Sequence, residues 1–196
     1  MDAIEIKNLV KRYAEKTAVD NISFSVKRGE FFGFLGPNGA GKTTTINSIT
    51  GIGKFDSGEI KVFGLDVVRD YREARRKIGL SPQEFNVDFF GTVRNVLDFY
   101  GGYFGMKKAE RQKRMEELFE KLGLAPYADK QFRALSGGFK RRLMLARAMM
   151  HDPEILILDE PTAGADVELR RDLWRILTEL NQKGKTIFLT THYLEE

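Results

Sequence analysis

The chain has 196 residues, of which 42% are hydrophobic and 31% are charged, a balance typical of one folded domain with its own core. The absence of cysteine from the sequence excludes disulfides and thiolate metal sites. The net charge of +4 is the small difference between 32 basic and 28 acidic side chains, so it gives no reason to expect a nucleic-acid partner.

The first third of the chain is typical of β-strands. Apolar residues alternate with polar ones over residues 4–6 and 22–26, the pattern of half-buried strands. Residues 31–35 form a continuous apolar run, which predicts a strand buried on both faces of a parallel sheet. A helix is expected over residues 42–50, and short strands over residues 58–63 and 77–80.

The middle of the chain, residues 85–151, is rich in helical patterns. Thr92 is placed to cap a first helix, and residues 107–122 carry apolar side chains at helical spacing. Ser136 precedes another helix. Strand and helix then alternate again, with a buried strand at residues 155–158, an amphipathic helix ended by Gly184, and a strand at 186–190. Buried strands separated by helices predict an α/β core.

A glycine-rich loop lies between the strand at 31–35 and the following helix. Residues 36–43 match the pattern G-x-x-x-x-G-K-[ST] of a phosphate-binding loop. Lys42 is expected to reach the β- and γ-phosphates of a nucleotide, and Thr43 to ligate Mg²⁺. The residues expected to bind the nucleotide are Gly36, Pro37, Asn38, Gly39, Ala40, Gly41, Lys42, Thr43 and Thr44. The loop alone leaves open a small-molecule kinase, a GTPase, a helicase or a transporter ATPase.

Two adjacent carboxylates, Asp159 and Glu160, follow the buried strand at 155–158. They should stand at the carboxyl edge of the sheet, where ligands bind. Asp159 is then suited to hold Mg²⁺, and Glu160 to activate a water as general base. An ordinary exit from a strand is the alternative interpretation, and the phosphate loop favours the catalytic one.

A second glycine-rich helix start, Leu135-Ser136-Gly137-Gly138, offers another anion site. One nucleotide does not need two such sites on one chain. We therefore expect Ser136, Gly137 and Gly138 to serve a nucleotide held by another copy. A simple serine cap with flexible glycines is the alternative.

Together the motifs GPNGAGKTT, LSGGF and ILILDEPTAG resemble the nucleotide-binding domain of the ATP-binding cassette (ABC) transporter family, most closely the bacterial exporter ATPases. The resemblance spans nearly the whole chain. It implies a P-loop NTPase core (residues 1–84 and 152–196) with a small antiparallel β subdomain and an inserted α-helical subdomain (85–151). It also implies a head-to-tail pair, with ATP held between one chain's phosphate loop and the other chain's residues 136–138, hereafter the signature loop.

The resemblance assigns four further residues. Tyr13 is similar to the aromatic that stacks on adenine, and Gln83 to the glutamine near Mg²⁺ and the attacking water. Asp166 is similar to an aspartate that crosses the pair's interface, and His192 to the histidine that contacts the γ-phosphate. His151 is expected to be structural.

The sequence departs from the family pattern at three places. Phe139 replaces a glutamine after Leu-Ser-Gly-Gly, and Ala165 replaces a leucine before Asp166. The chain ends four residues after His192, at Tyr193–Glu196, so the C-terminus is expected to be truncated relative to the family.

These features predict an Mg-dependent ATPase that energises transport by a separate membrane-spanning permease. No apolar run approaches the roughly 18–20 residues of a membrane-spanning helix, so we expect a cytoplasmic chain bound to the inner face of the membrane through its partner. The segment 84–90, with Phe85, Phe89 and Phe90, is a candidate for docking that permease. A soluble cassette ATPase acting on ribosomes or DNA, and a non-catalytic clamp, are the alternatives.

Overall fold

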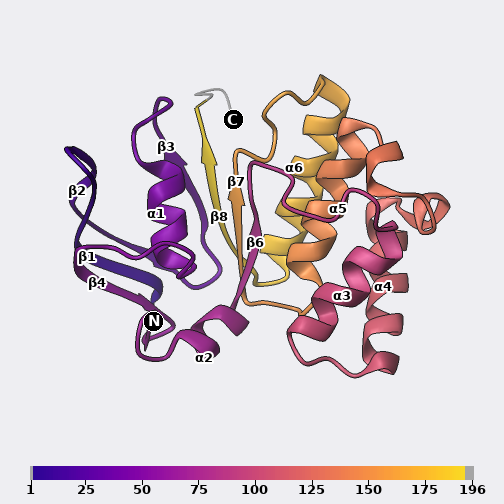
Figure 1. The fold of residues 1–196 in the computed structure, drawn as a ribbon, viewed down its shortest axis with the longest axis horizontal. Coiled ribbons are helices and arrows are strands. Elements are labelled where there is room, and N and C mark those ends of the chain that lie inside the picture. Colours follow the sequence, from indigo (N-terminus) through magenta and orange to yellow (C-terminus); the bar gives the residue numbers. More distant parts are fainter. Residues whose placement is uncertain (1, 193–196) are drawn as a thin grey trace.

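A computed structural model describes residues 2–192. It contains two four-stranded sheets and the helices that cover them (Figure 1). The antiparallel sheet has the strand order β2 (Lys16–Lys27), β1 (Asp2–Tyr13), β4 (Ser57–Val62) and β5 (Leu65–Asp66). The other sheet has the order β3 (Phe31–Leu35), β8 (Thr186–Thr191), β7 (Ile155–Asp159) and β6 (Ile78–Ser81), and its strand pairs are parallel.

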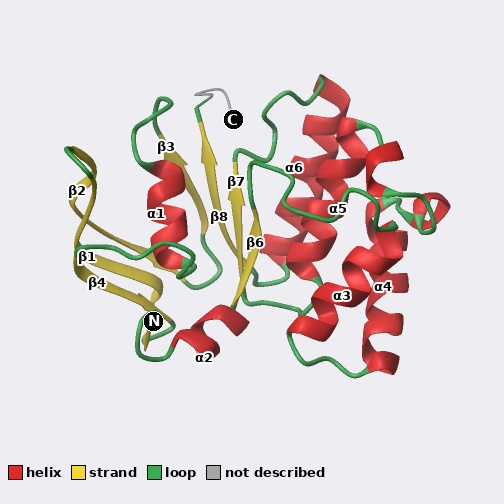
Figure 2. Ribbon diagram, viewed as in Figure 1, coloured by secondary structure: helices red, strands yellow, loops and turns green. Residues whose placement is uncertain are grey.

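Six α-helices lie among the described residues: α1 (Lys42–Ile49), α2 (Tyr71–Arg76), α3 (Val93–Tyr103), α4 (Lys108–Leu122), α5 (Gly137–Met149) and α6 (Val167–Gln182). Two 3₁₀ turns, η1 (Ala125–Tyr127) and η2 (Phe132–Ala134), join α4 to α5. No helix within residues 2–192 is long and apolar enough to cross a membrane. The parallel sheet separates α1 and the antiparallel sheet from α3–α6 (Figure 2).

The buried strand β7 divides the hydrophobic core in two. Ile155 and Ile157 pack on the side of α1 and the antiparallel sheet, whereas Leu156 and Leu158 pack on the side of the helices. Successive side chains of a strand point to opposite faces, so a continuous apolar run supplies both cores. The predictions of a mixed α/β fold and of a buried strand at 155–158 are confirmed.

Strand β3 differs from the expectation. Its backbone lies at the edge of the parallel sheet, and Leu35 is 54% exposed. Phe31 packs on Trp174 of α6, and Phe32 packs on Phe188, so both faces are covered, but only in part. The apolar run predicts a parallel strand correctly and cannot specify its position in the sheet.

The helix ends follow the local sequence. Thr92 caps α3, and its hydroxyl accepts a hydrogen bond from the Asn95 amide at 3.2 Å, as predicted. Gly123 ends α4 in the left-handed conformation that favours glycine. Strand β5 and helix α2 are too short to show a hydrophobic period, so the sequence pattern does not indicate them. The division into a core and a helical subdomain with boundaries at 85 and 151 stays a prediction.

Candidate functional site

The carboxyl ends of the four parallel strands meet at one edge of their sheet, because β3 pairs with β8, β8 with β7, and β7 with β6 in parallel register. The segments that follow these strands therefore gather there. They bring the loop at 36–41, Gln83, Glu160 and His192 to the same region. Ligands bind at this edge in open α/β sheets.

The phosphate loop ends at Gly41, which occupies the N-cap position of α1 with φ +88°, a left-handed conformation that glycine adopts without strain. A Cβ at this position would collide with the backbone carbonyl oxygen of Ala18, so only glycine fits. Lys42 lies 6% exposed, and its Nζ donates to the carbonyl oxygens of Gly36 at 2.6 Å and Pro37 at 3.1 Å. The first turn of α1 holds no acidic residue, which leaves the positive end of the helix available to an anion.

Asp159 stands beside Thr43, as a shared metal site requires. The Thr43 hydroxyl donates to Oδ2 of Asp159 at 2.8 Å, and the Thr190 hydroxyl donates to Oδ1 at 2.6 Å. Asp159 is 3% exposed. A hydroxyl and a single carboxylate fit Mg²⁺, which is usually held by one or two carboxylates together with substrate phosphates.

Three predicted site residues converge on the carboxylate of Glu160, which is 6% exposed. Its Oε1 lies 3.4 Å from Nζ of Lys42, and its Oε2 accepts a hydrogen bond from Nε2 of Gln83 at 3.1 Å. Nδ1 of His192 lies 3.3 Å from the same Oε2. The Glu160 amide donates to the side chain and the carbonyl of Thr190, and its backbone has φ +47°, a left-handed conformation unusual for glutamate. Such strain is found where the surroundings fix a functional residue.

Tyr13 lies apart from this convergence, at the end of β1. Its ring is 51% exposed, and the ammonium group of Lys11 lies 4.9 Å from the ring centroid. The exposed ring is compatible with stacking on a base, and its role at adenine stays a prediction. His151, in contrast, stacks on Phe104 with ring centroids 3.7 Å apart and lies 3.1 Å from the carbonyl oxygen of Ile78 through Nε2, as expected of a structural histidine.

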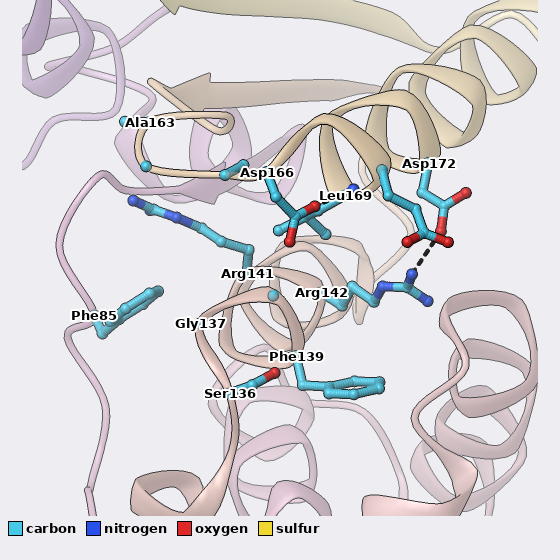
Figure 3. Close-up of a pocket in the computed structure, with 14 residues that line it drawn as sticks. Phe85, Ser136, Gly137, Phe139, Arg141, Arg142, Ala163, Asp166, Leu169 and Asp172 are labelled. Atoms are coloured by element: carbon cyan, nitrogen blue, oxygen red, sulfur yellow. Dashed lines mark hydrogen bonds and ion pairs between the residues drawn. The ribbon is translucent and has the colours of Figure 1, made fainter.

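The signature loop lines a different cavity, of about 540 Å³ (Figure 3). Ser136 occupies the N-cap position of α5, but its side chain makes no capping hydrogen bond to that helix. The serine-cap alternative is therefore not supported. Asp166, across the cavity, caps α6 by accepting a hydrogen bond from the Leu169 amide at 2.8 Å. Tyr193–Glu196 lie outside the described residues.

The cavity that contains Thr43, Gln83 and Asp159, of about 680 Å³, does not include the signature loop. Phe85 lines both cavities. One chain thus presents a phosphate loop with its carboxylates in one place and the signature loop in another. This separation agrees with the expectation that Ser136, Gly137 and Gly138 serve another copy.

Two contacts of the site were missed by reasoning from the sequence. Thr190 orients the carboxylate of Asp159 and accepts hydrogen bonds from the backbone amide of Glu160. The only signal for it in the sequence is its place near the end of the strand at 186–190. Arg141 donates through Nη1 to the carbonyl oxygen of Gln83 at 2.7 Å. No local pattern links residues that lie so far apart in the sequence.

The protein-family model described as "ABC transporter" matches residues 19–163. The chain belongs to the ABC transporter family. The resemblance inferred from the three motifs is therefore confirmed. In this cassette the phosphate loop at 36–43 and the carboxylates at 159–160 both fall inside the matched region.

The cassette is similar over nearly its whole length to bacterial export proteins. It is 48% identical over 194 residues to the Nod factor export ATP-binding protein I of Paraburkholderia xenovorans, covering 99% of this chain and 64% of that protein. It is 43% identical over 193 residues to the linearmycin resistance ATP-binding protein LnrL of Bacillus subtilis, covering 98% of this chain and 62% of that protein. The chain thus spans less than two thirds of the length of these curated relatives.

Solved cassettes have the same fold. A dimeric bacterial ABC transporter cassette superposes with a TM-score of 0.89 at 31% identity, covering 98% of this chain and 89% of that one. A dimeric post-hydrolysis cassette bound to ADP and Pi superposes with a TM-score of 0.88 at 30% identity, covering 98% and 89%. The predicted fold, a parallel core with an antiparallel sheet and added helices, is confirmed by these neighbours.

Proposed function

We propose that this chain is an Mg-dependent ATPase that energises transport by a separate membrane-spanning partner, through ATP-driven closure of two copies. The observation that carries the proposal is the convergence of Lys42, Gln83 and His192 on the buried carboxylate of Glu160, next to a phosphate loop. A clamp that only binds nucleotide has no need of a general base at this place.

The roles of the residues follow from their positions. The loop amides and the positive end of α1 bind the phosphates, and Lys42 moves its ammonium from the loop carbonyls to the β- and γ-phosphates. Glu160 accepts a proton from the attacking water, while Gln83 orients that water through its amide. His192 stabilises the charge of the γ-phosphate. A positioned base contributes roughly 10²–10⁴-fold to such a reaction.

Thr43 and Asp159 are the residues that would hold Mg²⁺, with Gln83 at the edge of the same cavity. When bound, the ion neutralises charge that develops on the phosphate oxygens. The 2.8 Å hydrogen bond between the Thr43 hydroxyl and the Asp159 carboxylate supports this assignment, because it places two oxygen ligands side by side.

The second half of each site is proposed to come from another copy, through Ser136, Gly137 and Gly138. The test is the ATPase rate per chain against protein concentration. A rate that rises with concentration supports the shared site, and a constant rate from low to high concentration would overturn it. Lys42→Ala should weaken ATP binding itself, measured by titration with a nucleotide analogue, whereas Lys54→Ala at an exposed position is its control.

The proposed partner is a permease, which would place the chain on the cytoplasmic face of a membrane. A cavity of about 630 Å³ beside the segment 84–90 supports this idea. It is lined by Val87 and by aromatic side chains of α3, of which Phe99 is 77% and Tyr103 70% exposed. Apolar patches of this kind mark interaction surfaces. Docking here would be supported if a polytopic membrane protein co-purifies with the parent chain and no longer co-purifies with the Phe99→Ser variant. It would be contradicted if the parent chain recovers no such protein from its native membranes.

The relatives named for Nod factor export and linearmycin resistance favour an exporter over a cassette that acts on ribosomes or DNA. Binding of nucleic acid that weakens steeply with salt would support the second function instead.

A further inference from the structure

Arg141 connects α5 to the backbone of Gln83 in the same chain. It stands in the second turn of α5, the helix that the signature loop begins. Its Nη1 donates to the backbone carbonyl oxygen of Gln83 at 2.7 Å, and its guanidinium lies 4.8 Å from the ring centroid of Phe85. In Figure 3 the side chain extends away from Arg142, which pairs instead with Asp172 of α6.

A second arginine of α5 holds the same segment further along. Arg147 donates through Nη1 to the carbonyl oxygen of Asn86 at 2.8 Å, and its guanidinium lies 5.3 Å from the ring centroid of Tyr100. The backbone from residue 83 to residue 86 is therefore attached to α5 at both ends. Bonds from a charged donor are about twice as strong as neutral ones, so this attachment is stiff.

The charge of Arg141 also interacts electrostatically with the carboxylates of the candidate nucleotide site. Removal from water lowers the pKa of Arg141 from its usual value, and the negative charges of Glu160 and Asp159 oppose this shift by favouring the charged form. A cation of α5 thus lies within electrostatic range of Asp159 and Glu160, the carboxylates proposed to act on this chain's own nucleotide. The signature loop lies about one turn earlier, at the start of α5, and would contact the nucleotide of the second copy.

We propose that Arg141 is a positioning residue that couples the two nucleotide sites of a pair, by linking the signature loop of one site to Gln83 of the other. This inference rests on the paired ATPase proposed above. When the signature loop closes on the second copy's nucleotide, α5 shifts, and the Gln83 carbonyl shifts with it. The Gln83 amide, hydrogen-bonded to Glu160 at 3.1 Å, then follows. A displacement of about 1 Å at reacting groups changes rates by roughly 10²-fold, so a small shift is sufficient.

The test compares Arg141→Met with the parent chain. Methionine keeps the apolar stem against Phe85 but removes the charge and the donors. Three quantities are measured: the dissociation constant for an ATP analogue, kcat, and the Hill coefficient of the ATPase reaction. We expect unchanged analogue binding, a kcat lowered about 10- to 100-fold, and a Hill coefficient lowered to unity. Arg141→Lys, which keeps a charge and one donor, should recover part of both effects.

Lys140→Gln is the matched control, because it removes one positive charge from the neighbouring position of α5. Its Nζ lies 5.4 Å from the ring centroid of Phe132, and within residues 2–192 it makes no hydrogen bond to the segment 83–86. It should keep the parent's Hill coefficient. If Arg141→Met does not fold, as judged by its thermal unfolding, the comparison is made with Arg141→Lys.

The outcomes separate this inference from the proposed function. A lowered kcat with the parent's Hill coefficient would overturn coupling and leave Arg141 with a local role. Weakened analogue binding would also overturn it, because the residue would then belong to the binding site. A parent chain whose rate per chain is independent of concentration and whose Hill coefficient is unity would instead overturn the paired site itself.

Discussion

Replacing Glu160 by glutamine isolates the contribution of a carboxylate at this position. Glutamine has the same shape and still accepts the 3.1 Å hydrogen bond from Gln83. Its cost to stability should be small, because Lys42 keeps two carbonyl acceptors, at Gly36 and Pro37, when its 3.4 Å ion pair is lost. A buried charge left without any partner lowers the free energy of unfolding by roughly 3–5 kcal/mol. Because Lys42 keeps these two acceptors, the substitution should lower it by only about 1 kcal/mol.

The effect on turnover should be far larger. Loss of a general base lowers kcat by roughly 10²–10⁴-fold, equivalent to about 3–5 kcal/mol in the activation free energy. The assay is phosphate release at saturating ATP, with the assembly state followed by size-exclusion chromatography. We expect ATP to hold Glu160→Gln as a pair, because closure no longer ends in hydrolysis. Turnover within twofold of the parent would refute the assignment of Glu160 as base. Loss of both turnover and thermal stability would show that the variant had failed to fold.

Two further predictions concern stability. Gly41→Ala should lower the free energy of unfolding by about 2 kcal/mol or more. The added Cβ would collide with the Ala18 carbonyl oxygen, and alanine would also have to adopt an unfavourable φ of +88°. Gly105→Ala is the control, because φ is +80° there but the space around a Cβ is open. It should lower the free energy of unfolding by only about 1 kcal/mol, the cost of the backbone conformation alone. Equal losses for the two variants in urea titrations would contradict the close approach at Gly41. Burial lowers the pKa of His151 from 6.5 to about 4, despite the favourable contact with the Ile78 carbonyl oxygen. The unfolded chain therefore takes up a proton first as pH falls, so stability is lost between pH 6.5 and 4 by up to about 3 kcal/mol. His151→Gln should flatten this dependence, and a parallel dependence in parent and variant would contradict it.

The parts of the site that follow from local chemistry could be predicted from the sequence. The loop at 36–43 needs glycines for its turns and a lysine at a fixed offset, so its pattern can be recognised from the sequence alone. The strand at 155–158 and its carboxylates could be placed for a similar reason, since a continuous apolar run of this length predicts a buried strand. Thr92 was recognisable because a cap acts within three residues.

The parts that depend on pairing between distant segments could not be predicted. Nothing in residues 31–35 specifies that β3 lies at the sheet edge, because edge or centre is decided by which strands pair beside it. The hydrogen bonds from Thr190 to Asp159 and from Arg141 to Gln83 join segments far apart in sequence. Gln83 and His192 could be assigned only through the family resemblance, because a single glutamine or histidine after a strand has no distinguishing pattern of its own.

The left-handed backbone of Glu160 has a consequence for how this position can change over evolutionary time. With φ at +47°, β-branched residues are disfavoured, whereas glycine, asparagine and aspartate adopt such a conformation with little strain. A lineage that gave up hydrolysis but kept closure on ATP would therefore drift toward these three residues, or keep a long unbranched side chain such as glutamine. Valine or isoleucine would strain the backbone at the end of β7, where the amide of residue 160 bonds to Thr190. The fold therefore limits which residues position 160 can accept before any selection for chemistry.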